Sequence, residues 1–96
     1  MGSYRVLKVD TKPSKYGGKF HYIYMKSLAD GSSARTCVQD TNGNYARWSR
    51  IVQLVKDGKL DDLDIIVNGA RVLRKGLIDA DSMISTKIGN KQEALI

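Results

Sequence analysis

Aromatic and basic side chains crowd into one short segment, residues 19–26, which reads Lys-Phe-His-Tyr-Ile-Tyr-Met-Lys. Successive side chains of a β-strand point to opposite faces. In a strand, one face of this segment is aromatic and ends in a cation: Phe20, Tyr22, Tyr24 and Lys26. The other face suits a core: His21, Ile23 and Met25. Flat rings among positive charges can stack bases and hold phosphates. The plainer alternative is a half-exposed strand that uses aromatic residues for β-propensity and cross-strand packing.

The positive charge of the chain belongs to its first half. Residues 1–56 contain ten Lys or Arg against three Asp, whereas residues 57–96 contain six basic against seven acidic residues. Four of the seven aromatic residues also fall between Tyr16 and Tyr24. A concentrated positive field attracts polyanions and speeds their arrival, so nucleic acid is the leading partner class. The alternative, that the positive charge is unspecific and serves only solubility, remains open.

Thirteen residues are the candidates for contact with nucleic acid. They are the basic and aromatic residues of the first half, with a second cluster near residue 73: Lys8, Lys12, Lys15, Tyr16, Lys19, Phe20, Tyr22, Tyr24, Lys26, Arg35, Arg71, Arg74 and Lys75. Sequence-tolerant capture of a single strand needs only a groove of cations and a few ring faces. Arg47 and Arg50 lie one turn apart on a predicted helix, where a solvated surface is the favoured interpretation.

Catalytic and metal chemistry find little support in the sequence. Cys37 is alone, so an internal disulfide is excluded, and with a single histidine a zinc site is not expected. A Mg²⁺ site would have to come from Asp61, Asp62, Asp64, Asp79 and Asp81, but acids beside turns are more often solvated. We therefore expect a non-enzymatic protein without cofactor or metal. We also expect a cytoplasmic protein, because a lone cysteine fits a reducing cytosol. No apolar run is long enough for a membrane, and the start lacks the apolar stretch of a signal peptide.

The hydrophobic pattern predicts three strands, one helix and then two more strands. The strands are expected at residues 4–9, 19–28, 33–39, 63–67 and 70–84, with the last interrupted near Gly76. Residues 11–18 are expected to form a basic loop, and Asn68-Gly69 to form a two-residue hairpin turn. Trp48, Ile51, Val52 and Val55 follow the spacing of one helical face and predict a helix that ends at Gly58. On that face Trp48 is expected to fill a core.

This order of elements is typical of the five-stranded, partly open Greek-key barrel called the OB-fold, with its helix between strands three and four. The chain resembles the small single-stranded DNA-binding proteins of bacteria, phages and mobile elements over residues 4–84. The resemblance rests on element order, a basic first loop and aromatic residues on strand two. It implies a binding face on strands two and three, flanked by the 12–18 loop and by the Asn68-Gly69 turn.

Several matters stay open at the level of sequence. Binding of RNA by the same barrel is one alternative, because discrimination rests on the 2′-OH. Another is a protein-interaction or inhibitor domain whose exposed Tyr, Phe and Arg residues are contact hot spots. A homodimer is also compatible with a small barrel. Residues 85–96 are expected to be a flexible tail. They lack the acidic tip through which bacterial relatives recruit repair proteins, so recruitment of that kind is not expected.

Overall fold

The computed structural model describes residues 2–91 and consists mostly of β-strands, with one α-helix. In chain order the elements are β1 (Gly2–Pro13), β2 (Lys19–Ser27), β3 (Ser33–Gln39), α1 (Tyr45–Lys56), the 3-10 turn η1 (Lys59–Asp61), β4 (Leu63–Ala70), β5 (Val72–Arg74), β6 (Leu77–Ile78) and β7 (Ser85–Asn90). The predicted fold class is confirmed at this level, including the helix between the third and fourth strands. The described residues form seven strands, however, rather than the expected five.

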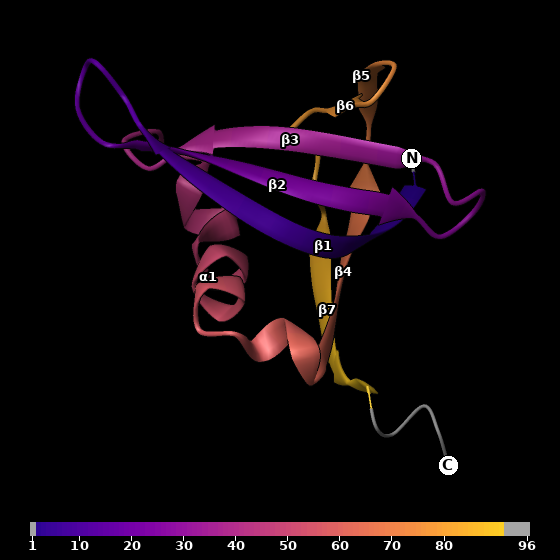
Figure 1. Ribbon diagram of the computed structural model, residues 1–96. Coiled ribbons are helices and arrows are strands. Elements are labelled where there is room, and N and C mark those ends of the chain that lie inside the picture. Colours follow the sequence, from indigo (N-terminus) through magenta and orange to yellow (C-terminus); the bar gives the residue numbers. More distant parts are fainter. Residues whose placement is uncertain (1, 92–96) are drawn as a thin grey trace.

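The strands form one curled sheet in the order β5-β6-β3-β2-β1-β4-β7. β6 pairs in parallel with β3, and β7 pairs antiparallel with β4, although both strands belong to the single stretch 77–90. This stretch therefore reaches opposite edges of the sheet, which bends round into the half-barrel seen in Figure 1. The layer of β1, β2 and β3 covers the upper part of the molecule, and α1 lies beneath it.

The core lies between this layer, the helix and β4. Trp48, Ile51 and Val52 of α1 are buried, as the helical spacing predicted. Trp48 is 0% exposed, and its indole Nε1 donates a hydrogen bond of 2.9 Å to the carbonyl oxygen of Ala80. The expectation that this ring fills a core is confirmed. Gly58 follows the helix with φ of 76°, a left-handed conformation that glycine adopts without steric cost.

The first hairpin is longer than the sequence suggested. Thr11, Lys12 and Pro13 were expected in a loop, but they extend β1 and pair with the start of β2. Pro13 faces Lys19 at the last position of the ladder, where a residue without an N–H group is tolerated. The connection is reduced to residues 14–18, closed by a hydrogen bond from Ser14 N to Gly18 O.

The prediction of a hairpin turn at Asn68-Gly69 is wrong. Both residues lie inside β4, where Asn68 pairs with Ser3 on one side and with Ser85 on the other. The Asn68 side chain accepts a hydrogen bond from Ser3 Oγ at 2.7 Å, so it is used to join strands. The chain turns instead between β5 and β6, at Lys75 and Gly76, where Gly76 has φ of 77°.

The boundary of the expected tail is also wrong. Ser85–Asn90 forms β7, which pairs with β4 along six residues. The alternation of buried and exposed residues along β7 is weak, because only Thr86, Ile88 and Gly89 are partly buried and the remaining side chains are polar. The last part of the expected tail, 92–96, lies outside the described residues.

Candidate nucleic-acid interface

β2 separates two kinds of side chain, as the alternation predicted. His21, Ile23 and Met25 face inward and are at most 2% exposed. Phe20, Tyr22 and Tyr24 face the other way and are half-buried, with the exposed Lys26 at the end of their row. The inward residues belong to the core with Trp48, so the aromatic residues lie on the side of the sheet that faces away from α1.

Strand pairing extends this aromatic row sideways onto β1 and β3. Across the sheet, Tyr24 lies between Lys8 and Arg35, and Phe20 lies between Lys12 and Gln39. Tyr22 lies between Asp10 and Cys37. We call the outward side chains of these three rows, together with Lys26, the aromatic face. Each row sets one ring among polar or charged neighbours, and the cations outnumber the single carboxylate.

A β-bulge explains why Lys8 belongs to the aromatic face. Strict alternation would put Lys8 on the inward side with Val6. The register between β1 and β2 shifts between Val6 and Lys8, so Leu7 and Lys8 are both exposed and Val9 packs on the core again. An extra residue of this kind re-aims the side chains that follow it. Lys12 reaches the same face because of the same shift.

Lysines from β1 lie over two of the tyrosine rings. Lys8 Nζ is 4.8 Å from the centre of the Tyr24 ring, and Lys12 Nζ is 5.7 Å from that of Tyr22. These are cation–π distances. Lys8 Nζ also lies 3.7 Å from Asp10 Oδ2. A base could stack on these ring faces only if the lysine side chains moved aside, and the displaced ammonium groups would then be near the phosphate of the same nucleotide.

The loop between β1 and β2 carries three more candidate residues. Tyr16 is 94% exposed at its tip, and Lys15 and Lys19 are exposed on either side. The base of the loop is fixed, because Lys19 N donates to Asp40 Oδ1 at 2.9 Å and Gln39 Nε2 donates to Gly17 O at 3.3 Å. The loop thus presents Tyr16 from an anchored base at one end of the aromatic face.

The second basic cluster approaches the aromatic face through β6. Arg35 N donates to Gly76 O at 2.9 Å, so the β5–β6 turn lies directly beside Arg35. Arg74 and Lys75 are exposed there, whereas Arg71 is engaged with Asp79 at 2.7 Å. The backbone N–H of Asp81 and then the Arg71 guanidinium, both donating to the Asp79 carboxylate, lower the pKa of Asp79 and keep it charged, so Arg71 is partly neutralised.

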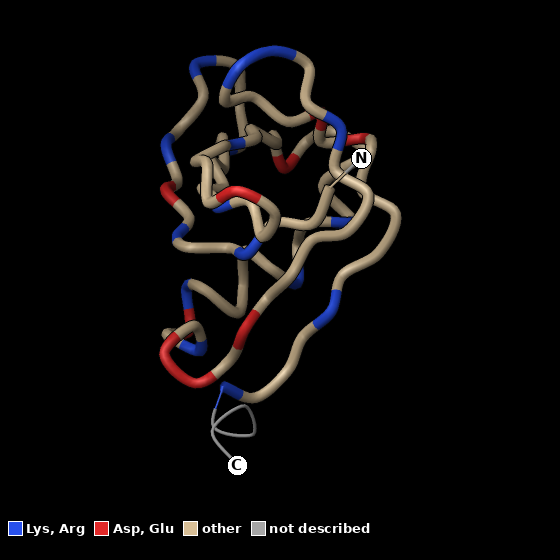
Figure 2. The backbone as a smooth tube through the Cα atoms, turned by 90° about the vertical axis from the view of Figure 1, so that its right-hand side faces the viewer, with Lys and Arg blue, Asp and Glu red and all other residues tan. Residues whose placement is uncertain are grey.

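Both basic loops stand on the same side of the molecule, the top in Figure 1. Figure 2, viewed from the right of Figure 1, shows Lys and Arg in the loops at that end. The structure brings Lys8, Lys12, Phe20, Tyr22, Tyr24, Lys26 and Arg35 together on the aromatic face, with Lys15, Tyr16 and Lys19 at one end and Arg74 and Lys75 beside β3. Arg71 points into an ion pair instead.

His21 lies beneath the aromatic face. Its ring stacks on Tyr45 at 5.0 Å, its Nδ1 shares a hydrogen bond of 2.9 Å with Thr11 Oγ1, and its Nε2 is 3.6 Å from Asp40 Oδ2. Burial, aided by the charge of Lys56, lowers the pKa of this imidazole below 6.5 despite the nearby carboxylate. The expectation that His21 faces the core is confirmed, but its Nε2 is buried without a hydrogen-bond partner among the described residues, so the ring is only partly satisfied.

Cys37 lies on the aromatic face, in the row of Tyr22 and next to Arg35 along the outward side of β3. The residue is exposed, yet partial burial raises the pKa of its thiol. The neutral thiol is a poor nucleophile at neutral pH. Cys37 therefore adds a small, uncharged surface beside Tyr22.

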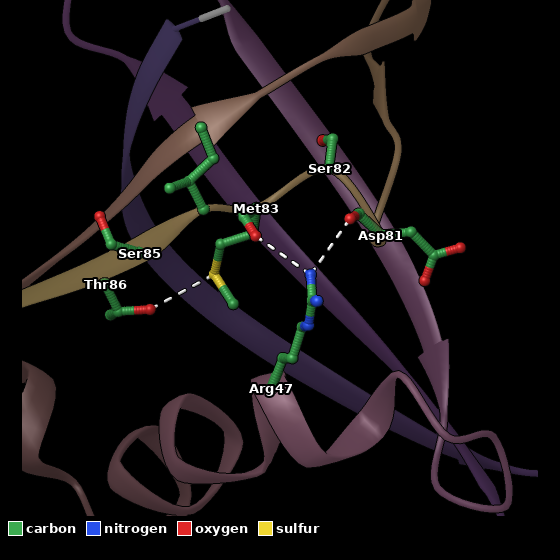
Figure 3. A pocket seen from close by; sticks show the side chains of 7 residues that line it. Arg47, Asp81, Ser82, Met83, Ser85 and Thr86 are labelled. Carbon is green, nitrogen blue, oxygen red and sulfur yellow. Dashed lines mark hydrogen bonds between the residues drawn. The ribbon is translucent and has the colours of Figure 1, made fainter.

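Sequence reasoning missed the role of Arg47, which was expected on a solvated helix surface. Its Nη1 donates to the carbonyl oxygens of Asp81 and Met83, each at 3.3 Å. Figure 3 shows the guanidinium reaching from α1 to this segment, beside a hollow of about 580 Å³ lined also by Ser82, Ser85 and Thr86. Arg47 therefore fixes the segment between β6 and β7, and no local sequence signal reports a contact over more than 30 residues.

Among residues 2–91, no three His, Cys, Asp or Glu side chains are grouped as a metal site would require. None of the helices described is both long and apolar enough to span a membrane. Comparison of the chain with protein-family models, with curated proteins and with solved structures gives no match.

Proposed function

We propose that this protein binds single-stranded DNA without strong sequence preference, by stacking bases on the aromatic face and holding phosphates with the cations around it. The observation that carries the proposal is the set of cross-strand rows, in which Lys8, Tyr24 and Arg35 lie side by side. Each stacked base contributes on the order of 1 to 3 kcal/mol to binding of this kind. No catalytic group is required, and none is assigned.

The spacing of the rings favours a single strand over a duplex. Residues two apart on a strand, such as Tyr22 and Tyr24, are separated by roughly 6.6 to 6.8 Å. Stacked bases in a duplex strand rise by only about 3.4 Å. Successive bases can meet successive rings only in an extended, unstacked strand. A duplex also hides the faces of its bases.

The element order and the flanking loops support an OB-fold-like barrel of the single-stranded DNA-binding type. The helix follows the third strand, a short strand pairs in parallel with β3, and β4 returns to β1. In this proposal the β1–β2 loop and the β5–β6 turn flank the binding face, the latter replacing the Asn68-Gly69 turn. Arg74 and Lys75 then serve as the basic residues of the second flank.

Binding of labelled oligo-dT, oligo-rU and duplex DNA of equal length, each over a range of salt concentrations, tests the proposal. We expect tighter binding of oligo-dT than of duplex. The logarithm of the binding constant should fall with the logarithm of salt by about 0.7 for each phosphate neutralised. Equal affinity for oligo-dT and duplex would refute stacking. Preference for oligo-rU would move the proposal to RNA, and a slope near zero would favour a protein partner.

A further inference from the structure

A shallow hollow of about 400 Å³ lies at the end of the aromatic face farthest from the β1–β2 loop. We call it the end hollow; it is lined by Arg5, Leu7, Lys26, Ser27, Leu28 and Gly31. Two elements build it: β1, which presents Arg5 and Leu7 on its outward side, and the turn that follows Ser27 at the end of β2. The β2–β3 turn lies at the right in Figure 1.

The lining of the end hollow is amphipathic. Leu7 and Leu28 are each 46% exposed, although both are large apolar side chains. Single exposed leucines need no explanation, but these two share one hollow with the exposed cation Lys26. An apolar surface with a positive rim matches a ligand that has a flat, weakly polar body and a negative charge. A nucleotide has this chemistry.

The end hollow continues the aromatic face. Lys26 is two residues beyond Tyr24 on the same side of β2, a step of roughly 6.6 to 6.8 Å. Arg5 pairs with Lys26 across the ladder, so the row after Tyr24 is cationic rather than aromatic. Arg5 Nε lies 3.4 Å from Asp64 Oδ1, which partly neutralises the guanidinium and leaves Lys26 as the principal cation. A strand stacked on Tyr22 and Tyr24 reaches this hollow with its next nucleotide.

We propose that the end hollow binds one further nucleotide of the single strand, with the base against Leu7 and Leu28 and the phosphate beside Lys26. This inference rests on the proposed function and adds a subsite without an aromatic residue. The tyrosines hold the shortest strands, and the end hollow contributes only when a strand is long enough to occupy both regions.

The test measures affinity for oligo-dT of increasing length, from about 4 to about 16 nucleotides, the range of site sizes found for small barrels. Leu28→Ser should weaken binding of the longest oligomers roughly tenfold and leave the shortest unchanged. Leu7→Ser, which changes the other apolar wall of the end hollow, should likewise weaken binding of the long oligomers alone. Ile84→Ser is the matched control, because Ile84 is 71% exposed but lies outside the aromatic face. Thermal melting verifies that each variant is folded.

The outcomes separate this inference from the proposed function. If Leu28→Ser and Leu7→Ser bind every length like the parent, or lose affinity equally at every length, the end hollow is not a separate subsite while strand binding stands. If the parent shows no preference for single strands, both proposals fall. Binding of a peptide rich in Asp and Leu in place of oligo-dT, abolished by Leu28→Ser, would overturn the inference in favour of a protein partner.

Discussion

The two faces of β2 differ in what their side chains contribute. Ile23 and Met25 are at most 1% exposed and pack with Trp48, so they stabilise the fold. Tyr22 and Tyr24, one residue away in each case, are half-buried under lysine side chains and contact no part of the helix-side core. The inward face is explained by folding alone. The outward face combines rings with cations, and the proposed binding of a single strand rests on this combination.

The largest expected effect concerns the inward side. Trp48→Ala should cost roughly 3 to 5 kcal/mol of unfolding free energy, because it removes a fully buried ring and leaves a cavity. Denaturant unfolding measures this loss. Trp48→Phe should cost less, since it keeps most of the volume and loses only the hydrogen bond to Ala80. A stable Trp48→Ala protein with weakened oligo-dT binding would instead make Trp48 part of the interface.

A smaller effect is expected for the cation beside Tyr24. Lys8→Gln should leave melting unchanged, lower the affinity evenly across base sequences and flatten the salt slope by about 0.7. Salt titration of oligo-dT binding measures the slope. Lys87→Gln, which removes an exposed lysine from β7, should leave it unaltered. Equal effects of the two substitutions would mean that net charge, rather than the aromatic face, attracts the strand.

Arg47 tests whether a basic residue outside the aromatic face behaves differently. Arg47→Ala should lower the unfolding free energy by about 1 kcal/mol, because two hydrogen bonds to the 81–83 segment are lost. Under conditions in which the variant is fully folded, its affinity for oligo-dT should equal that of the parent within experimental error. A steep loss of affinity in a protein of normal stability would extend the interface to α1.

His21 gives the smallest expected effect, through pH. Its pKa is lowered in the folded protein, so the unfolded chain takes up a proton first as the pH falls below about 6.5. The His21 contribution is therefore complete above that pH and is progressively lost below it. The melting temperature should fall between about pH 7 and about pH 5, and His21→Gln should reduce this dependence. An unchanged pH profile in the variant would assign the effect to other groups.

The sequence predicted much of the candidate site because alternation along β2 has a strict period. His21, Ile23 and Met25 could be placed inward from their positions alone, and β3 began and ended at the expected residues. The helical spacing of Trp48, Ile51 and Val52 was equally informative. These signals are local, and the core confirms them.

The failures arise where distant contacts override local signals. Asn68-Gly69 has strong turn chemistry, but pairing with Ser3 and Ser85 holds it in β4. β7 has too few apolar residues to show a pattern, and its pairing with β4 decides its conformation. The bulge at Leu7, which turns Lys8 outward, has no sequence signature. Lys8 could therefore be proposed as a candidate from its positive charge, but its outward direction could not be predicted from the sequence.

The central claim is that the outward rings of β2 bind bases and are not needed for the fold. The double variant Tyr22→Ala, Tyr24→Ala tests it most directly, with melting and oligo-dT affinity measured on the same sample. We predict nearly unchanged melting and a loss of binding of roughly 1 to 3 kcal/mol for each ring that stacks. A variant that unfolds, or one that is folded and binds oligo-dT like the parent, would contradict the claim.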